Sequence, residues 1–350
     1  MDQAFSPKQA SVFVTGGSGL VGAHLLSDLA GKGKKIRALK RKHSDLSTVK
    51  KVFGYYHKDP GQAWADVEWV DGNLNSPDFL RKALRGVEVV YHSAAMVSFD
   101  PKDRLKLFDI NVGGTDLIAS LSLRGGVRKF CFVSSSASLG KPEGVSGYIN
   151  EDTPWVTTDD LSDYAVSKYE AEQRVWQIAG QGLETVVINP VIVIGPGDWS
   201  RSSSRLIQAV WNGFPFYSSG SNAFVDVRDV AKAAVSLTES HIHGERFIVS
   251  AENLPYKRLF DLIADNLNRR RPAIKVPGFM GEFAWRADWV ASKLSGKPPQ
   301  ITKATVASAA KQYHFSNEKI RSQLNMDFIP LERSIEETCR RFLEDRYSPS

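Results

Sequence analysis

The chain has 350 residues, of which 42% are hydrophobic and 24% charged. This composition is that of an ordinary globular protein and excludes collagen-like, low-complexity and disordered chains. The 45 Lys and Arg residues against 39 Asp and Glu residues leave a net charge of +6, which is too mild to indicate a nucleic-acid-binding protein.

The cysteine count and the apolar runs predict where the protein resides. Cys131 and Cys339 are the two cysteines, too few for a disulfide framework or a closed zinc site. No apolar run has the length of a signal peptide or a membrane span. We therefore expect a cytoplasmic protein without stable membrane insertion.

Short apolar runs alternate with helical patterns along the first 190 residues. The helical patterns lie near residues 19–30, 45–56, 77–85, 103–123 and 162–180. The expected strands lie near residues 11–16, 35–40, 67–70, 87–92, 129–134 and 184–189. Such alternation calls for parallel pairing with right-handed crossovers. The predicted fold class is α/β, with a doubly wound parallel sheet of the Rossmann type that binds ligands at the carboxyl ends of its strands.

This alternation loosens after residue 190. Residues 224–239 and 246–250 still predict a helix and a strand of the sheet, whereas the remaining segments are richer in Trp, Phe, Pro and Ser. We therefore predict a smaller, discontinuous substrate-binding lobe. The predicted boundaries are 1–190 and 223–250 for the dinucleotide-binding domain, and 191–222 and 251–350 for the lobe.

A glycine-rich turn follows the first predicted strand. Residues 15–22 read TGGSGLVG, with Gly16, Gly19 and Gly22 at every third position. Such a turn brings a helix N-terminus against a pyrophosphate without an intervening side chain. Because it lies between a predicted strand and a predicted helix, it indicates a dinucleotide site rather than a surface turn.

The end of the second predicted strand bears on which dinucleotide binds. An NAD-binding site usually has an acidic residue there, but this chain has Lys40, Arg41 and Lys42. Arg41 could make charge-assisted hydrogen bonds to an adenosine 2′-phosphate, so NADP(H) is favoured. The alternative is that the basic residues only solvate the strand end and that NAD(H) binds, with Ser44 or the backbone on its ribose.

Tyr164 and Lys168 form the candidate proton-transfer pair. Side chains four residues apart share one face of a helix, and we expect the ammonium to lower the pKa of the phenol and ease proton donation. The alternative is an exposed pair of unrelated residues. Three serines, residues 134–136, end the preceding strand. They cannot all face one direction, and we choose Ser136 as the one that meets a substrate oxygen.

Seven segments in order resemble the extended short-chain dehydrogenase/reductases of the NAD-dependent epimerase/dehydratase superfamily, and its dihydroflavonol-reductase-like branch most closely. They are TGGSGLVG at 15–22, YHSAA at 91–95, NVGGT at 111–115, SSSAS at 134–138, YAVSK at 164–168, INPVIVIGPGD at 188–198 and FVDVRDVA at 224–231. The resemblance covers almost the whole chain. It implies an enzyme, an NADPH-dependent reductase of ketones or aldehydes. A nucleotide-sugar epimerase or dehydratase and a non-catalytic dinucleotide-sensing module are the alternatives.

The resemblance also implies roles for individual residues. Ser136 would polarise the substrate carbonyl, Tyr164 would exchange the proton and Lys168 would bind the nicotinamide ribose. Asn111 would support the site from its helix, unless it only caps the helix or bonds in the core. His92 is expected to be structural. The implied cofactor-binding residues are Thr15, Gly16, Gly19, Leu20, Val21, Gly22, Arg41, Asn73, Leu74, Ser93, Ala94, Ala95, Tyr164, Lys168 and Pro190.

Two departures from the family pattern bear on the ligands. Asn73 stands where many relatives have an Asp that contacts adenine, which puts that contact in doubt. Asn189 precedes Pro190 where many nucleotide-sugar enzymes have Arg, which favours a reductase.

Aromatic side chains near the expected substrate position predict a largely apolar ligand, with core packing as the alternative. They are Phe99, Trp199, Phe214, Phe216 and Tyr217, together with Met96. Arg201 and Arg205 are candidates for a nucleotide pyrophosphate, or are surface charges. The apolar helix expected near 279–294 is interpreted as a lid or a core helix. No metal site is predicted, and the implied partners are a small-molecule carbonyl or nucleotide sugar and a second copy of the chain.

Overall fold

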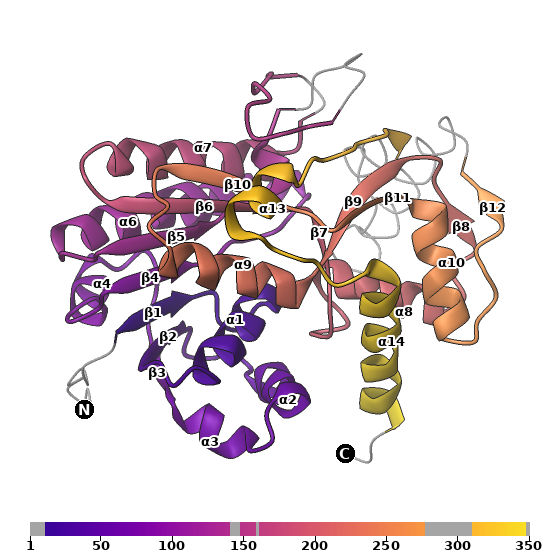
Figure 1. The fold of residues 1–350 in the computed structure, drawn as a ribbon, viewed down its shortest axis with the longest axis horizontal. Coiled ribbons are helices and arrows are strands. Elements are labelled where there is room, and N and C mark those ends of the chain that lie inside the picture. Colours follow the sequence, from indigo (N-terminus) through magenta and orange to yellow (C-terminus); the bar gives the residue numbers. More distant parts are fainter. Residues whose placement is uncertain (1–10, 141–147, 159–160, 277–309, 348–350) are drawn as a thin grey trace.

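The computed structural model describes residues 11–140, 148–158, 161–276 and 310–347. A seven-stranded sheet with the order β10-β6-β5-β4-β1-β2-β3 lies at its centre (Figure 1). All its strand pairs are parallel, which confirms the predicted doubly wound sheet. The strands are β1 (Val12–Thr15), β2 (Ile36–Lys40), β3 (Val67–Asp71), β4 (Val89–His92), β5 (Lys129–Val133), β6 (Glu184–Pro190) and β10 (Glu245–Val249).

Two apolar cores cover the two faces of this sheet, and the strands supply both by alternation. On β1, Val12 and Val14 face one core and Phe13 faces the other, because successive side chains of a strand point to opposite faces. The first core packs against α1 (Leu20–Ala30), α2 (Ser47–Tyr56) and α9 (Val227–Glu239). The second packs against α4 (Pro77–Ala83), α6 (Gly114–Arg124) and α7 (Asp163–Ala179).

Three predicted element bounds differ from the structure. The helix predicted over 103–123 is divided into α5 (Arg104–Phe108), a π-helical turn (Asp109–Gly113) and α6. Residues 224–226 are strand rather than helix, because Asp226 accepts a hydrogen bond from the backbone N–H of Arg228 and caps α9 there. An extra helix, α3 (Pro60–Ala65), begins at a proline after the capping Asp59.

A second lobe is built from smaller sheets and the helices around them. We use this name for the elements that pack around a third apolar core and the strands beside them. In one sheet β9 pairs with β11 antiparallel and with β7 parallel, and in the other β8 pairs with β12. The helix predicted near 279–294 lies outside the described residues. The elements are β7 (Ile192–Ile194), β8 (Phe216–Tyr217), β9 (Ser221–Asp226), β11 (Glu252–Pro255), β12 (Ile274–Lys275), α8 (Arg205–Trp211), α10 (Tyr256–Asn266) and α14 (Leu331–Tyr347). A further helix, α13 (Glu318–Leu324), packs beside β10 (Figure 1).

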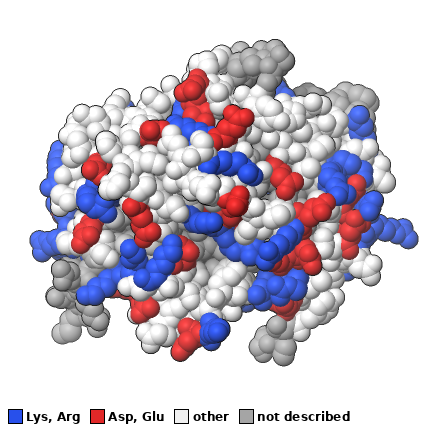
Figure 2. Space-filling view, in the orientation of Figure 1, with Lys and Arg blue, Asp and Glu red and all other residues white. Residues whose placement is uncertain are grey.

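The basic run near residues 32–43 is divided among separate ion pairs. Lys34 pairs with Glu239, and the fully buried Arg37 pairs with Glu68. Figure 2 shows basic and acidic side chains interspersed on the face in view. Within the described ranges, no helix is both long and apolar enough to cross a membrane.

Candidate active site

The predicted site segments meet at the carboxyl edge of the central sheet. Thr15, the last residue of β1, lies opposite His92 at the end of β4, and His92 lies opposite Phe132 on β5. Val133 in turn lies opposite Ile188 on β6. Because these strands are parallel and in register, the loops that follow them lie at one edge of the sheet, where ligands bind in sheets of this kind.

The glycine turn leaves no room for side chains. Gly16 has a φ of +73°, and a Cβ atom there would lie 2.5 Å from the backbone nitrogen of Ala94. A Cβ atom at Gly22 would lie 2.1 Å from the carbonyl oxygen of Gly16. The N–H of Gly19 donates to that same oxygen at 2.9 Å. The turn is therefore fixed by close contacts between backbone atoms.

The helix that follows this turn begins at the carboxyl end of β1. Helix α1 begins at Leu20, with Gly19 as its N-cap and no side chain of the described part of the chain capping it. The N–H groups of Leu20, Val21 and Gly22 belong to the first turn, which lacks partners within the helix. An uncapped helix N-terminus beside a glycine turn fits the pyrophosphate of a dinucleotide.

His92 links three elements beneath this turn. Its ring nitrogens lie 2.6 Å from the Thr15 hydroxyl and 2.9 Å from the Thr115 hydroxyl. Burial lowers the pKa of His92 to about 3, and the charge of Lys168 acts in the same direction. His92 is therefore a neutral residue that joins β1, β4 and α6, which agrees with the structural role expected for it.

The loop after β4 is tied directly to β1. The Ser93 hydroxyl donates to the carbonyl oxygen of Thr15 at 2.7 Å, and the N–H of Ala94 donates to the Thr15 hydroxyl at 3.3 Å. Ala95 is the first exposed residue of this loop. Ser93 and Ala94 therefore lie beside the glycine turn, and the cofactor contacts of all three residues stay predictions.

At the ends of β2 and β3, the positive charge of Lys40 is offset by the carboxylate of Asp71. Their side chains form an ion pair of 2.5 Å between the ends of β2 and β3, whereas Arg41 is exposed one residue further on. The Asn73 carboxamide accepts from the N–H of Asn75 at 3.1 Å, which shapes the loop after β3. The remaining predicted contacts, Leu74 after β3 and Pro190 at the end of β6, are both buried.

The hydroxyls of the three serines after β5 have different partners, as expected, but the serine that acts on Tyr164 is not the one that we chose. The Ser134 hydroxyl points into the protein and donates to Glu172 at 2.7 Å. The Ser135 hydroxyl accepts from the N–H of Ala137 at 3.1 Å and influences the pKa of the Tyr164 phenol. Ser136 is half-buried at the start of a short 3₁₀ turn. Ser135, rather than the chosen Ser136, is thus the serine that influences the pKa of Tyr164, and the role of Ser136 stays a prediction.

Tyr164 and Lys168 occupy the first turns of α7. The Ser162 hydroxyl caps this helix by accepting from the N–H of Ala165 at 3.1 Å. Burial raises the pKa of Tyr164, and the Ser135 hydroxyl opposes that rise. The net pKa of Tyr164 is therefore raised rather than lowered, because the cost of burying the phenolate dominates, and the lowering by Lys168 stays a prediction.

Lys168 is buried against the end of β5. Its ammonium donates to the carbonyl oxygen of Val133 at 3.0 Å and lies 4.3 Å from the centre of the Phe132 ring. Burial lowers the pKa of Lys168 to about 7, and the charge of Glu172 opposes this shift. Near neutral pH a small change in its surroundings will therefore change its charge.

Asn111 fixes the loop after β4 to α7. It is buried in the π-helical turn, where its side chain accepts from the N–H of Met96 at 2.7 Å and donates to the Met96 carbonyl at 2.9 Å. Its amide also donates to the Ser167 hydroxyl at 3.0 Å. The core hydrogen bonding that the sequence left open is present, and π-helical turns are frequent at functional sites.

Of the predicted apolar lining, Phe99 contacts the candidate proton donor. Its ring is edge-on to that of Tyr164 at 5.8 Å and is 40% exposed, and the nearby Val97 is 56% exposed. Other members take part in packing elsewhere: Trp199 lies against Phe342, Phe214 against Phe216, and Tyr217 beneath Lys257. Arg201 pairs with Asp198.

Sequence reasoning missed Glu172, a buried carboxylate below the serine turn. It lies four residues after Lys168 and eight after Tyr164, so all three share one face of α7. The spacing Y-x₃-K-x₃-E was the available signal. Across the described ranges, no group of His, Cys, Asp and Glu side chains is arranged to bind a metal ion.

Comparison with known proteins adds to this geometry. Residues 12–250 match the model of the NAD dependent epimerase/dehydratase family. The chain is 31% identical to "Sterol demethylase protein B" of Methylococcus capsulatus, over 76% of this chain and 77% of the relative. It is 27% identical to "Putative dihydroflavonol 4-reductase" of Synechocystis, over 96% and 95% of the two chains. The solved structure of gox2253 is similar over 97% of this chain and 99% of its own, with 27% identity and a TM-score of 0.78.

Proposed function

The chain belongs to the NAD-dependent epimerase/dehydratase family, and from that premise we propose that it is an NADPH-dependent reductase of ketones or aldehydes with a large apolar body. Family membership and the resemblance to extended short-chain dehydrogenase/reductases were predicted from the sequence and are confirmed. The reaction, the choice of NADPH and the substrate class are the proposal. The observation that carries it is the position of Lys168, whose ammonium donates to the carbonyl oxygen of Val133 at the end of β5 and which lies one helical turn after Tyr164 on α7.

The dinucleotide would bind along the carboxyl edge of the sheet. The uncapped N–H groups at the start of α1 would bind its pyrophosphate, and a bound dinucleotide supplies the hydride of such reactions. Asp71 neutralises Lys40, which makes the exposed Arg41 the residue placed to meet a 2′-phosphate. The positive charge of Arg41, rather than that of the paired Lys40, would favour NADPH over NADH.

Tyr164 would donate the proton to the substrate oxygen as that oxygen gains negative charge. A hydroxyl of the serine turn would donate a hydrogen bond to the same oxygen. The phenolate left on Tyr164 is unfavourable in a buried place, so the ammonium of Lys168 would stabilise it. Lys168 can do so only while it is protonated, and its pKa of about 7 ties the activity to a pH near neutral.

The substrate side supports an apolar ligand. Val97 and Phe99 are exposed apolar residues on the loop after β4, and Phe99 contacts Tyr164. Two relatives bear the names of a sterol demethylase protein and a dihydroflavonol reductase, and both names refer to ring systems with large apolar surfaces. We assign the second lobe to substrate binding on the same basis. The homodimer and the cytoplasmic location stay predictions.

A substrate panel tests the proposal. Purified protein is incubated with NADPH or NAD⁺ and with steroid ketones, flavonoid ketones, simple aldehydes and nucleotide sugars. Loss of the reduced nicotinamide absorbance reports reduction, and mass spectrometry or chromatography of the products reports epimerisation or dehydration, which consume no cofactor. We expect turnover of at least one apolar ketone and none of the nucleotide sugars. Turnover of a nucleotide sugar alone would overturn the proposal in favour of an epimerase or dehydratase.

Analysis of the nucleotide released from freshly purified protein separates the same alternatives. A reductase exchanges its cofactor in each cycle and is expected to release little NAD on denaturation. An epimerase regenerates its cofactor and is expected to retain NAD in near-stoichiometric amount. Mass spectrometry of the denatured protein's supernatant distinguishes the two results.

A further inference from the structure

The buried carboxylate of Glu172 accepts hydrogen bonds from two segments of the candidate site, the serine turn and β6. One of its oxygens accepts from the hydroxyls of Ser134 and Ser138, at 2.7 and 2.8 Å. The same oxygen accepts from the Asn189 amide at 2.9 Å. Ser134 and Ser138 bracket the turn that contains Ser135, so Glu172 anchors both ends of the turn whose Ser135 influences the pKa of Tyr164.

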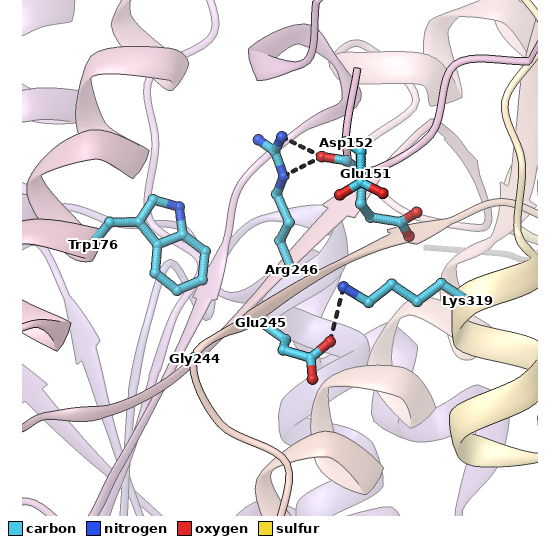
Figure 3. A pocket seen from close by; sticks show the side chains of 7 residues that line it. All are labelled: Glu151, Asp152, Trp176, Gly244, Glu245, Arg246 and Lys319. Atoms are coloured by element: carbon cyan, nitrogen blue, oxygen red, sulfur yellow. Dashed lines mark hydrogen bonds and ion pairs between the residues drawn. The ribbon is translucent and has the colours of Figure 1, made fainter. Parts of the chain in front are cut away.

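The second carboxylate oxygen of Glu172 faces the opposite direction, toward β10. It lies 3.3 Å from a guanidinium nitrogen of Arg246 and 3.4 Å from the indole nitrogen of Trp176. Arg246 also donates from Nε to the carbonyl oxygen of Glu151 at 2.8 Å. Figure 3 shows the guanidinium directed toward Glu151, with the Trp176 indole on the other side of it.

Arg246 and Trp176 are also part of a surface pocket of about 430 Å³. The other charged side chains of this pocket include Lys319, which pairs with Glu245 at 2.8 Å. Figure 3 shows that ion pair beside Arg246. One oxygen of the Glu172 carboxylate therefore contacts the serine turn of the candidate active site, and the other contacts two residues of this surface pocket.

We propose that Glu172 is a positioning residue for the proton-transfer pair, fixing the serine turn from below and placing a negative charge, oriented by Arg246, one helical turn from Lys168. The inference rests on the proposed function, since it assigns Lys168 and the serine turn to the reaction. Glu172 itself is buried beneath the turn and acts through these other groups.

The charges around Lys168 determine how the proposal can be tested. Glu172 on its own helix favours the ammonium form of Lys168. Arg246 on β10 pairs with Glu172 and so offsets part of the negative charge that favours the ammonium form. His92 on β4 is neutral, and Tyr164 is the remaining titratable neighbour on α7. Removing the acid and removing the arginine should therefore shift the titration of Lys168 in opposite directions.

The test compares Glu172→Gln and Arg246→Gln with Glu170→Gln, an exposed carboxylate on the same helix. NADPH binding, followed by fluorescence across pH, and the pH dependence of kcat/KM are measured for each variant. We expect Glu172→Gln to lower kcat about 10- to 100-fold, because the turn loses its anchor. We also expect the fall of kcat/KM at high pH, the basic limb of the pH profile, to occur about one pH unit lower than in the wild type. Arg246→Gln should move that limb higher, and Glu170→Gln should match the wild type.

A second substitution separates geometry from charge. Glu172→Asp keeps the negative charge but shortens the side chain, so it should lower kcat while leaving the basic limb near its wild-type pH. Circular dichroism and thermal melts establish which variants fold. If Glu172→Gln does not fold, Arg246→Gln, which alters a half-exposed residue of the surface pocket, decides the question alone.

The outcomes separate this inference from the proposed function. If a folded Glu172→Gln variant keeps the wild-type kcat and both limbs in place, the positioning role is wrong while the reductase stands. If the wild type reduces no carbonyl, the proposed function is wrong, and the pH dependence of NADPH binding still decides the positioning role. If NADPH binding has the same pH dependence in Glu172→Gln, Arg246→Gln and the wild type, the positioning role is wrong.

Discussion

The two halves of the sheet edge are built in different ways. In the half formed by β1, β2 and β3, close backbone contacts at Gly16 and Gly22 define the dinucleotide-binding turn. In the half formed by β4, β5 and β6, buried side chains define the site, with Asn111 and Glu172 as its two main hydrogen-bonding centres. The geometry of the first half is thus set by steric contacts between backbone atoms, and that of the second by hydrogen bonds between buried polar groups.

This difference explains how each half should respond to substitution. The glycine turn of the first half leaves almost no room for a larger residue at Gly16 or Gly22, but it contains no group that takes part in proton transfer. A polar network can accept changes of volume at its margin, but it loses function when one hydroxyl or charge is removed. Substitutions in the two halves should therefore affect different measured quantities.

The largest effect is expected in the polar half, at Tyr164. Tyr164→Phe removes the proton donor and should lower kcat by about 10²- to 10⁴-fold, the usual contribution of a positioned acid. NADPH binding and the melting temperature should change little. Tyr169→Phe is the matched control, because the Tyr169 ring stacks on Trp155 at 4.2 Å and that contact does not need the hydroxyl. Equal activity of Tyr164→Phe and the wild type would remove Tyr164 from the reaction.

The next largest effect is expected in the backbone half, at Gly22. A Cβ atom there would lie 2.1 Å from a carbonyl oxygen, so Gly22→Ala should destabilise the fold by about 3 kcal/mol and weaken NADPH binding. Gly54→Ala is the control, because no atom lies within 4 Å of its added Cβ. In helix α2 that substitution should stabilise the protein by about 0.5–1 kcal/mol. Thermal melts and NADPH titration measure both, and an unchanged Gly22→Ala variant would show that this contact does not fix the glycine turn.

The third prediction concerns which dinucleotide the backbone half selects. Arg41→Ala should weaken NADPH binding about 10- to 100-fold, the loss expected for a charged hydrogen bond, and leave NADH binding unchanged. Arg81→Ala, which alters an exposed arginine of α4 paired with Asp78, should change neither affinity. Parallel fluorescence titrations provide the comparison. A fall in both affinities, or in neither, would show that Arg41 does not recognise the 2′-phosphate.

The smallest effect concerns acid stability at the back of the glycine turn. Burial lowers the pKa of His24 to about 4, below its value of about 6.5 in an unfolded chain. Between these values the unfolded state binds the extra proton, so the free energy of unfolding falls as the pH falls, by about 1.4 kcal/mol per unit. His24→Asn should reduce this slope, whereas the same change at the exposed His43 should not. Urea unfolding at several pH values would detect a slope unaffected by His24→Asn, which would contradict the assignment.

The same contrast explains what the sequence could predict. The parallel sheet, the glycine turn and the Tyr164–Lys168 face followed from spacing, because each depends on the local period of the chain. The influence of Ser135 on Tyr164 and the raised pKa of Tyr164 depend on burial and on which way a turn faces, which spacing does not specify. Glu172 had a local signal in its spacing from Lys168, but its partners Ser134, Asn189 and Arg246 come from three different strand ends.

One measurement tests the central claim most directly. The wild type and Tyr164→Phe are incubated with NADPH that bears deuterium at the transferable nicotinamide position, together with the best ketone of the panel. The product alcohol is then analysed by mass spectrometry. The proposal predicts one deuterium in the alcohol formed by the wild type and almost no alcohol from the variant. Unlabelled alcohol, or equal labelled alcohol from both proteins, would contradict it.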